Sequence, residues 1–373
     1  MPNTEGFWEL VILFVLVLVV VFFLINTLIL RKLKNKSKIQ SILINVFLAL
    51  GLLFLFYRIH QIFPEEFNPT GIMLQSIVNS VVNSCVLALA TTGIVLIFKT
   101  SNTTNFSQGM IATVGAYVAA TFILSFATEL VELGNFTIVF LAMIVGAVTA
   151  FILGILIDVL IIRRAKVITS VGKQMITMGL VLVFAGSIPL VFGTIPLPIP
   201  KLSYAPNISF TLFGNLLSIT SHGFYSLIIS ITLLVVLFSA LRFTKWGLGV
   251  RATASSEVVA GMMGVNTRII TAMSWGIAGL LGGVAAVILT PSITIAGVSM
   301  MVPTQVNGFM AAILGSFSSF AGPLVASILI PILNGLLSFV VGLWKNAVVY
   351  LIILIIVLVK PMGLFGKKIA KKV

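Results

Sequence analysis

The chain of 373 residues is 60% hydrophobic and only 8% charged, and this composition excludes a soluble globular domain. A net charge of +14 would suit a nucleic-acid-binding protein, but the basic residues recur at the ends of apolar runs and do not form one basic face. The single cysteine, Cys85, excludes an intrachain disulfide. The sequence therefore predicts an all-α, polytopic membrane protein.

The first two apolar runs, at about 7–30 and 42–63, predict a pair of helices near the N-terminus. The first run is too long for a secretory signal, and Glu5 and Glu9 stand where a signal would carry a basic leader. We therefore expect a retained span with its N-terminus outside. Residues 1–65 are predicted to be an addition to a membrane domain at residues 66–373.

The third apolar run, at about 72–98, carries a polar stripe. Gln75, Asn79 and Asn83 follow one another at i, i+4 and i+8, so they share one face of a helix. Amide side chains in lipid must find partners, and this face is expected to point into protein or into a wet cavity. Two interpretations remain open, because such amides either hold packed helices together or line a translocation path.

The polar stretch at 99–110 is followed by further apolar runs separated by polar or charged loops. A proline-rich loop at 193–207 cannot be helical throughout. Beyond Pro291 the runs shorten and contain several glycines and prolines, which predicts broken helices inside the bundle. In total we expect about ten or eleven hydrophobic segments. The remaining predicted spans lie at about 111–126, 136–162, 174–191, 223–240, 269–289 and 347–359.

The stretch at about 241–268 is strongly charged and lies between two predicted spans. Its four cations would cost on the order of 10 kcal/mol in lipid, so it is expected to lie in water. Ser255 or Ser256 suits an N-cap, Glu257 suits the positive end of a helix dipole, and Gly264 suits a helix stop. These signals predict a helix of about two turns, which either docks into a partner or lies on lipid headgroups. Its apolar stripe consists of Val258, Met262 and Val265.

The charges predict the orientation. Threading the runs alternately through a membrane places all but three of the 22 basic residues on one side, the exceptions being Arg58, Lys201 and Lys345. Because cytoplasmic loops are enriched in Lys and Arg, the 241–268 stretch and the C-terminus are predicted to be cytoplasmic. Six of the eight acids fall on the opposite side: Glu5, Glu9, Glu65, Glu66, Glu129 and Glu132.

The sequence offers few groups for catalysis. The fragment GLFGKK lacks the spacing of a nucleotide-binding loop and the Ser or Thr after its Lys, and no HExxH pattern occurs. Asp158 is expected to pair with Arg163 or Arg164 more readily than to relay protons. We therefore predict no enzyme, no catalytic residue and no metal site.

Four stretches together carry a family resemblance: GIVLIFKTSNTTNFSQGMIATVGAYVAA, KWGLGVRATASSEVVAGMMGVNTRIITAMSWGIAGLLGGVAAVIL, FMAAILGSFSSFAGPLVASIL and VLVKPMGLFGK. In this order they resemble the membrane subunits of branched-chain amino acid ABC importers, of the LivH type within the LivH/LivM family. The resemblance covers about residues 76–368. It implies the LivH/LivM permease fold for the membrane domain.

The resemblance also implies a function. A permease subunit of this kind would translocate a small polar solute, such as a branched-chain or other amino acid, by alternating access driven by a separate ATPase. Urea and short amides are alternative solutes within the family, and an ion-coupled secondary transporter is a more distant alternative. ATP and magnesium are expected on the partner ATPase, with no cofactor in this chain.

The implied partners are ABC ATPase subunits, a second permease subunit that is LivM-like or a second copy, an extracytoplasmic solute-binding protein and membrane lipids, with no nucleic acid. The expected location is a bacterial cell membrane. The short cytoplasmic helix would be the coupling element, and the predicted coupling residues are Trp246, Gly247, Arg251, Ala252, Glu257, Met262 and Gly264. The path residues, predicted from polarity, are Gln75, Asn79, Asn83, Asn105, Gln108 and Gly109.

Overall fold

The computed structural model describes residues 69–126, 134–165, 169–293 and 296–366. The predicted N-terminal helical pair at 1–65 lies outside these residues. Within them, eight helical segments are long and apolar enough to cross a membrane, which confirms the all-α, polytopic prediction. The helices are α3 (Pro69–Ser101), α4 (Gln108–Phe126), α5 (Asn135–Leu156), η2 (Ile157–Ile162), α6 (Ser170–Phe192), α7 (Ser221–Phe243), α8 (Lys245–Ser255), α9 (Glu257–Met262), α10 (Thr267–Ile293), α11 (Val302–Gly315), α12 (Ala321–Val341), η3 (Gly342–Trp344) and α13 (Lys345–Val359).

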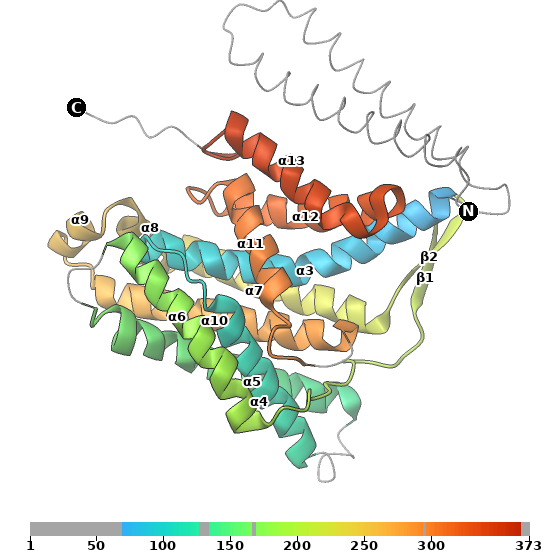
Figure 1. Ribbon diagram of the computed structural model, residues 1–373, viewed down its shortest axis with the longest axis horizontal. Coiled ribbons are helices and arrows are strands. Elements are labelled where there is room, and N and C mark those ends of the chain that lie inside the picture. Colours follow the sequence, from blue (N-terminus) through green and yellow to red (C-terminus); the bar gives the residue numbers. More distant parts are fainter. Residues whose placement is uncertain (1–68, 127–133, 166–168, 294–295, 367–373) are drawn as a thin grey trace, which may run out of the picture.

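The centre of the bundle is the pair α3 and α10, which pack against each other (Figure 1). The end of α3 meets the start of α10, where the Trp275 indole donates a hydrogen bond to Ser101 Oγ at 2.9 Å, so the two helices run antiparallel. α3 also packs against α11 and α12, and α10 packs in the same way against α4 and α5. The halves α3–α5 and α10–α12 thus repeat one arrangement in opposite directions, as inverted repeats of transporters do.

A short sequence similarity accompanies this repeat. Met110–Tyr117 reads MIATVGAY at the start of α4, and Met310–Phe317 reads MAAILGSF in and just after α11. The shared glycine lies at a close helix contact in both halves, because Gly115 packs on α5 and Gly315 packs on α12. Sequence analysis missed the repeat, since one eight-residue match is too short to establish a period.

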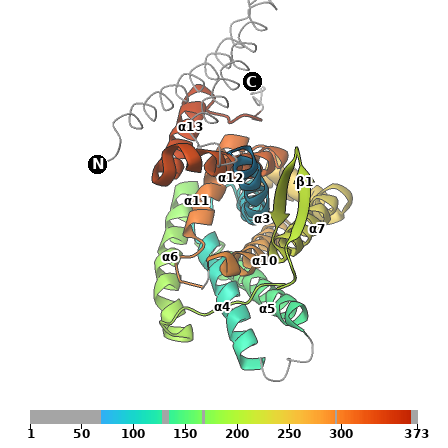
Figure 2. The same ribbon diagram turned by 90° about the vertical axis from the view of Figure 1, so that its right-hand side faces the viewer.

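Three of the spanning helices, α6, α7 and α13, lie at the periphery (Figure 2). Only 11% of the span residues of α6 and of α13 are buried, and 22% of those of α7. The helices that follow α10 are short or contain proline, as predicted, since α11 has only 14 residues and α12 contains Pro331. The peripheral helices therefore supply apolar surface that suits lipid or another subunit.

A β-hairpin after the proline-rich loop was not predicted. β1 (Ile208–Leu212) and β2 (Asn215–Ile219) pair antiparallel, with Ile208 opposite Ile219 and Leu212 opposite Asn215. The proline-rich loop before it contains no helix, as expected. The sequence signal was weak, because only Gly214 favours the turn between the two short apolar runs, while Phe213, with a φ of 49°, is not a residue typical of such a turn.

Candidate functional site

The charged stretch forms two short helices, α8 and α9, between α7 and α10 (Figure 1). Thr244 Oγ1 accepts a hydrogen bond from the Gly247 amide at 3.1 Å, and Ser256 Oγ accepts one from the Val259 amide at 3.3 Å, so a side chain caps each helix. Gly264 has a φ of 86°, which allows the chain to turn away after α9. The predicted two-turn helix is confirmed, whereas α8 was not predicted. We call residues 244–266 the elbow.

Four of the predicted coupling residues, Trp246, Gly247, Arg251 and Ala252, lie on α8, and Gly247 and Arg251 contact the end of α7. The Arg251 guanidinium donates a hydrogen bond to the Leu241 carbonyl, one of the last carbonyls of α7. A Cβ on Gly247 would overlap that same carbonyl, and Trp246 packs against the main apolar core. These residues fix the position of the elbow, while Ala252 is half-buried on the same helix.

The outer side of α9 is apolar and uncovered. Met262 and Met263 are each 80% exposed and Val258 is 67% exposed, whereas Ala260 is buried toward the protein. Val265, the third member of the predicted stripe, instead packs against the core, so the stripe prediction was wrong at that position. A six-residue helix is too short to be stable in water by itself. We call the set Val258, Val259, Met262 and Met263 the elbow surface.

The described part of the chain contains two acidic residues, Glu257 and Asp158. Glu257 is exposed at the start of α9, where the helix dipole favours an acid. Asp158 is buried in the π-helical turn η2, and its Oδ2 lies 2.6 Å from Arg163 Nη2, which confirms the predicted pairing with an arginine. The same nitrogen donates to the Arg268 carbonyl at 2.7 Å. Arg163 thus ties the end of α5 to the first turn of α10, directly after the elbow.

The polar segment between α3 and α4 forms a buried corner. Asn105 is 0% exposed, and its Oδ1 accepts hydrogen bonds from the Ser107 amide at 2.9 Å and from Ser107 Oγ at 2.7 Å. Gln108, 2% exposed, donates through Nε2 to the Ala278 carbonyl in α10 at 2.6 Å. Gln108 and Gly109 belong to the first turn of α4.

Gln305 of α11 completes this corner from the other half of the repeat. Its Oε1 accepts a hydrogen bond from the Gly109 amide at 2.6 Å, and its Nε2 donates to the Phe106 carbonyl. The amide of Phe106 in turn donates to Thr177 Oγ1 of α6 at 3.1 Å. We call Asn105, Ser107, Gln108, Gly109 and Gln305 the corner network. It joins α4, α10 and α11 at the point where the first turns of α4 and α11 meet.

The amide stripe of α3 is separate from the corner. Gln75 exchanges two hydrogen bonds with Ser218 of the hairpin: its Nε2 donates to the Ser218 carbonyl at 2.7 Å, and its Oε1 accepts from the Ser218 amide at 2.8 Å. Gln75 Nε2 also donates to Asn79 Oδ1 at 3.0 Å. Asn79 and Asn83 are exposed, although 78% of the residues in the α3 span are buried. From Asn79 to the end of α3 is roughly 33 Å at 1.5 Å per residue. In the corner, Gln108 Nε2 would lie 3.0 Å from a Cβ on Gly93 of α3, and Gly93 is roughly 15 Å along the helix from Asn83. The predicted path residues therefore fall into two separate groups along one helix.

Sequence reasoning missed Gln305 as a member of the corner. It is one amide in a run that was expected only to form broken helices, and its partners are about 200 positions earlier in the chain. The hydrogen-bond partner of Gln75 was missed for a similar reason, since the hairpin itself was not predicted. Two members of the elbow surface, Val258 and Met262, were predicted from their spacing on a short helix, whereas Val259 and Met263 were not.

An antiparallel repeat of spanning helices with a braced, amphipathic elbow on one side defines a polytopic membrane transport protein. More specifically, the chain belongs to the family described as branched-chain amino acid transport system, permease component, whose model matches residues 76–358. This confirms the predicted LivH-type permease, a subunit of an ABC importer.

The relatives agree with this assignment. The chain is 28% identical to a probable branched-chain amino acid transport permease protein LivH of Methanocaldococcus jannaschii over 77% of its own length and 90% of the relative. It is 22% identical to the high-affinity branched-chain amino acid permease protein LivH of Escherichia coli K12, over 80% of this chain and 97% of that one. It is also 22% identical to the BraD permease protein of Pseudomonas aeruginosa, over 80% and 98%. No solved structure matches the chain significantly.

Proposed function

We propose that this permease carries branched-chain amino acids into the cell and that its elbow surface docks onto a separate ATPase subunit. The names of the relatives in Methanocaldococcus jannaschii, Escherichia coli and Pseudomonas aeruginosa support the solute class. ATP and magnesium would bind the ATPase. A second permease subunit, LivM-like or a second copy, and an extracytoplasmic solute-binding protein would complete the importer.

The observation that carries this proposal is the elbow surface. A short helix with exposed Met and Val side chains is typical of a surface that inserts into a groove of a partner. The elbow is braced to the end of α7, because Arg251 bonds the Leu241 carbonyl, and the first turn of α10, which follows the elbow, is tied to the end of α5 by the bond from Arg163 to the Arg268 carbonyl. A displacement of α9 by a partner would therefore be passed to the central helices as a rigid movement.

The charges near the elbow support a cytoplasmic location for it. Lys99, Arg164 and Arg242 end three spanning helical segments on this side, as positive residues at cytoplasmic loops do. The chain also returns to this side after α13, since the Leu364 amide donates a hydrogen bond to the Leu314 carbonyl. We accordingly propose that the elbow and the C-terminus face the cytoplasm and that the N-terminus lies outside.

For the solute path we propose the outer part of α3. Exposed amides on an apolar spanning helix are costly against lipid, so Asn79 and Asn83 are expected to face a second permease subunit or the water between two subunits. Alternating access would open this region first to the outside and then to the cytoplasm. The corner network would form the rigid base around which this movement occurs.

The direct test of the whole proposal is uptake by the purified importer in sealed vesicles. Labelled leucine should accumulate only when ATP, the ATPase and the binding protein are present, and unlabelled isoleucine and valine should compete with it. Competition by urea or acetamide, with none by valine, would change the solute assignment. Accumulation that needs no ATPase would refute the coupling assignment.

The path assignment has its own test. The double change Asn79→Leu and Asn83→Leu should lower leucine uptake by at least about tenfold, because a polar solute loses its hydrogen-bonding partners. The matched control is Asn79→Gln with Asn83→Gln, which keeps both amides and should retain most uptake. Assembly with the ATPase should be unchanged in both variants. Normal uptake by the leucine variant would remove these residues from the path.

A further inference from the structure

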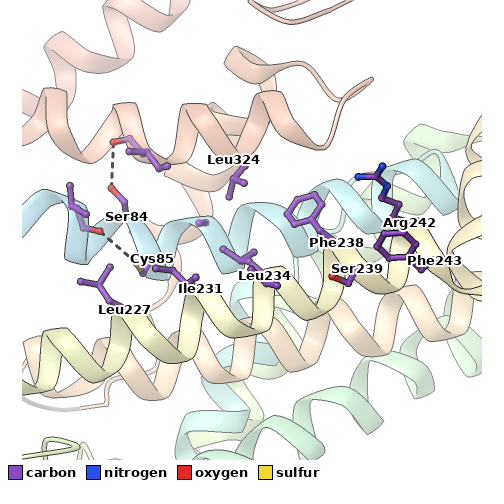
Figure 3. Close-up of a pocket in the computed structure, with 14 residues that line it drawn as sticks. Ser84, Cys85, Leu227, Ile231, Leu234, Phe238, Ser239, Arg242, Phe243 and Leu324 are labelled. Atoms are coloured by element: carbon purple, nitrogen blue, oxygen red, sulfur yellow. Dashed lines mark hydrogen bonds between the residues drawn. The ribbon is translucent and has the colours of Figure 1, made fainter.

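A cavity of about 510 Å³ lies between α3, α7 and α12, on the side of α3 away from the amide stripe (Figure 3). Helical spacing places Val81, Cys85 and Ala88 opposite Asn79 and Asn83 on α3, and neither asparagine lines the cavity. Along α7 the lining runs from Leu227 to Arg242, which is roughly 22 Å at 1.5 Å per residue. We call this cavity the slot.

The walls of the slot are apolar for most of its length. They are formed mainly by Val, Leu, Ile, Ala and Phe side chains of the three helices. The hydroxyl of Ser84 donates to the Ser80 carbonyl at 2.7 Å and to the Ile328 carbonyl of α12 at 3.4 Å, and Cys85 Sγ donates to the Val81 carbonyl at 3.6 Å, so both groups are already paired with backbone carbonyls. An occupant of this part of the slot would meet almost only hydrocarbon.

One end of the slot is cationic. Figure 3 shows Arg242 and Phe243 at one end and Leu227 at the other. The Arg242 guanidinium carbon lies 5.2 Å from the Phe243 ring centroid, and the side chain is exposed. Within the described residues the one ion pair is Asp158 with Arg163, so the charge of Arg242 has no acidic partner there. The elbow begins two residues further along the chain, which puts this end at the membrane surface on the elbow side.

The dimensions and charges decide between occupants. A helix about 10 Å across and as long as the slot would need roughly 1,700 Å³, more than the empty volume of about 1110 Å³ between its walls. A zwitterionic amino acid would need an acidic partner for its ammonium group, and neither Asp158 nor Glu257 lines the slot. A single hydrocarbon chain with an anionic head satisfies both the narrow apolar walls and the cation at the end.

We propose that the slot holds one acyl chain of an anionic phospholipid from the leaflet on the elbow side, with the lipid phosphate on Arg242. An arginine guanidinium binds a phosphate through paired charge-assisted hydrogen bonds, and one leaflet is about 15 Å deep, so one acyl chain fits along the slot below its head. Bound in this way, the lipid fills the gap between α7 and α12 next to the elbow. It would stiffen the attachment of α7, on which the elbow rests.

The test is native mass spectrometry of the full chain released from nanodiscs of equal phosphatidylcholine and phosphatidylglycerol. The wild-type protein should retain one phosphatidylglycerol under conditions that strip all other lipid. Arg242→Gln should lower this retention by roughly tenfold, since one charge-assisted pair is lost. The matched control Arg164→Gln removes the same charge at an exposed site outside the slot and should retain the lipid.

A second pair of variants tests the apolar part independently of charge. Val235 and Val236 are adjacent on α7 and about equally exposed, at 58% and 59%, but only Val235 lines the slot. Val235→Trp should displace the lipid and Val236→Trp should not. Retention that is equal in all variants, or no preference for phosphatidylglycerol in the wild type, would overturn the proposal. Loss of a second protein subunit from the Val235→Trp spectrum would overturn it as well, because the slot would then be a subunit interface.

Discussion

The elbow and the corner are both polar interruptions of a lipid-soluble sequence, yet they are built in opposite ways. In the corner, Asn105 and Gln108 are buried, and their hydrogen bonds are made to each other, to Ser107 and to the Ala278 carbonyl of α10. In the elbow, Thr244 and Ser256 satisfy the helix ends, and apolar side chains are left exposed. In these two regions polar residues thus mark positions where the backbone turns, and exposure decides which turn is available to a partner.

The corner and the elbow are also expected to contribute to different properties, the first to stability and the second to coupling. A buried amide network is stabilising only when all its members are paired, because an unpaired buried polar group costs about 1–3 kcal/mol. The corner is therefore expected to carry stability. A six-residue helix with exposed methionines adds little to stability, so the elbow is expected to carry coupling.

The largest effect is expected at Gly109 in the corner. A Cβ there would overlap Gln305 Oε1, so Gly109→Ala would displace the Gln305 amide and break its bonds to Gly109 and Phe106. We expect a loss of about 2 kcal/mol in the free energy of unfolding, from two half-buried hydrogen bonds at about 1 kcal/mol each. The measurement is thermal unfolding of the purified chain in detergent.

Gly179→Ala is the matched control for this change. Gly179 is also helical, and a Cβ at that position would meet nothing within 4 Å. This variant should unfold at the wild-type temperature or slightly above it, because alanine favours a helix over glycine. Equal destabilisation by both substitutions would show that the corner network carries no special share of the stability.

The second-largest effect is expected at the elbow surface, in the affinity of the permease for the ATPase. Met262→Asp would place a carboxylate where the proposal requires an apolar contact, so ATPase binding should weaken by roughly tenfold or more. Thermal unfolding of the isolated chain should not change, because Met262 is 80% exposed. Titration of the ATPase onto the purified permease measures the affinity.

Met262→Leu serves as the control, since it keeps an apolar side chain of similar size. It should bind the ATPase nearly as well as the wild type. If Met262→Asp binds equally well, α9 is not the docking element, and the alternative of a helix lying on lipid headgroups gains support. A drop in unfolding temperature would instead mean that Met262 packs against the bundle.

The comparison also explains how far the sequence could be interpreted. Long apolar runs predicted the spanning helices, and the cap at Ser256 with the stop at Gly264 predicted α9. These signals are local, because a helix depends on hydrophobic length and on its end residues. The family resemblance supplied the transport function.

Long-range partners could not be predicted in the same way. The residues near Gln108 in the sequence do not indicate its hydrogen bond to Ala278, and those near Gln75 do not indicate its hydrogen bond to Ser218. Polarity alone grouped Gln75 with Asn79 and Asn83, although the structure gives Gln75 a partner in the hairpin and leaves the two asparagines exposed. Which polar residues face a path depends on helix packing, and a single sequence does not encode that in any local pattern.

The smallest effect is expected at the end of the elbow helix, at Gly264. Its φ of 86° costs an alanine about 1 kcal/mol, so Gly264→Ala should loosen the last turn of α9. Hydrogen exchange at residues 257–263 should then quicken by roughly fivefold, while exchange in α3 and α10 stays unchanged. Gly261→Ala is the control, because that glycine is helical and its Cβ would meet nothing within 4 Å. If exchange instead quickens throughout the bundle, the elbow and the corner are not energetically separate, and the division of stability from coupling fails.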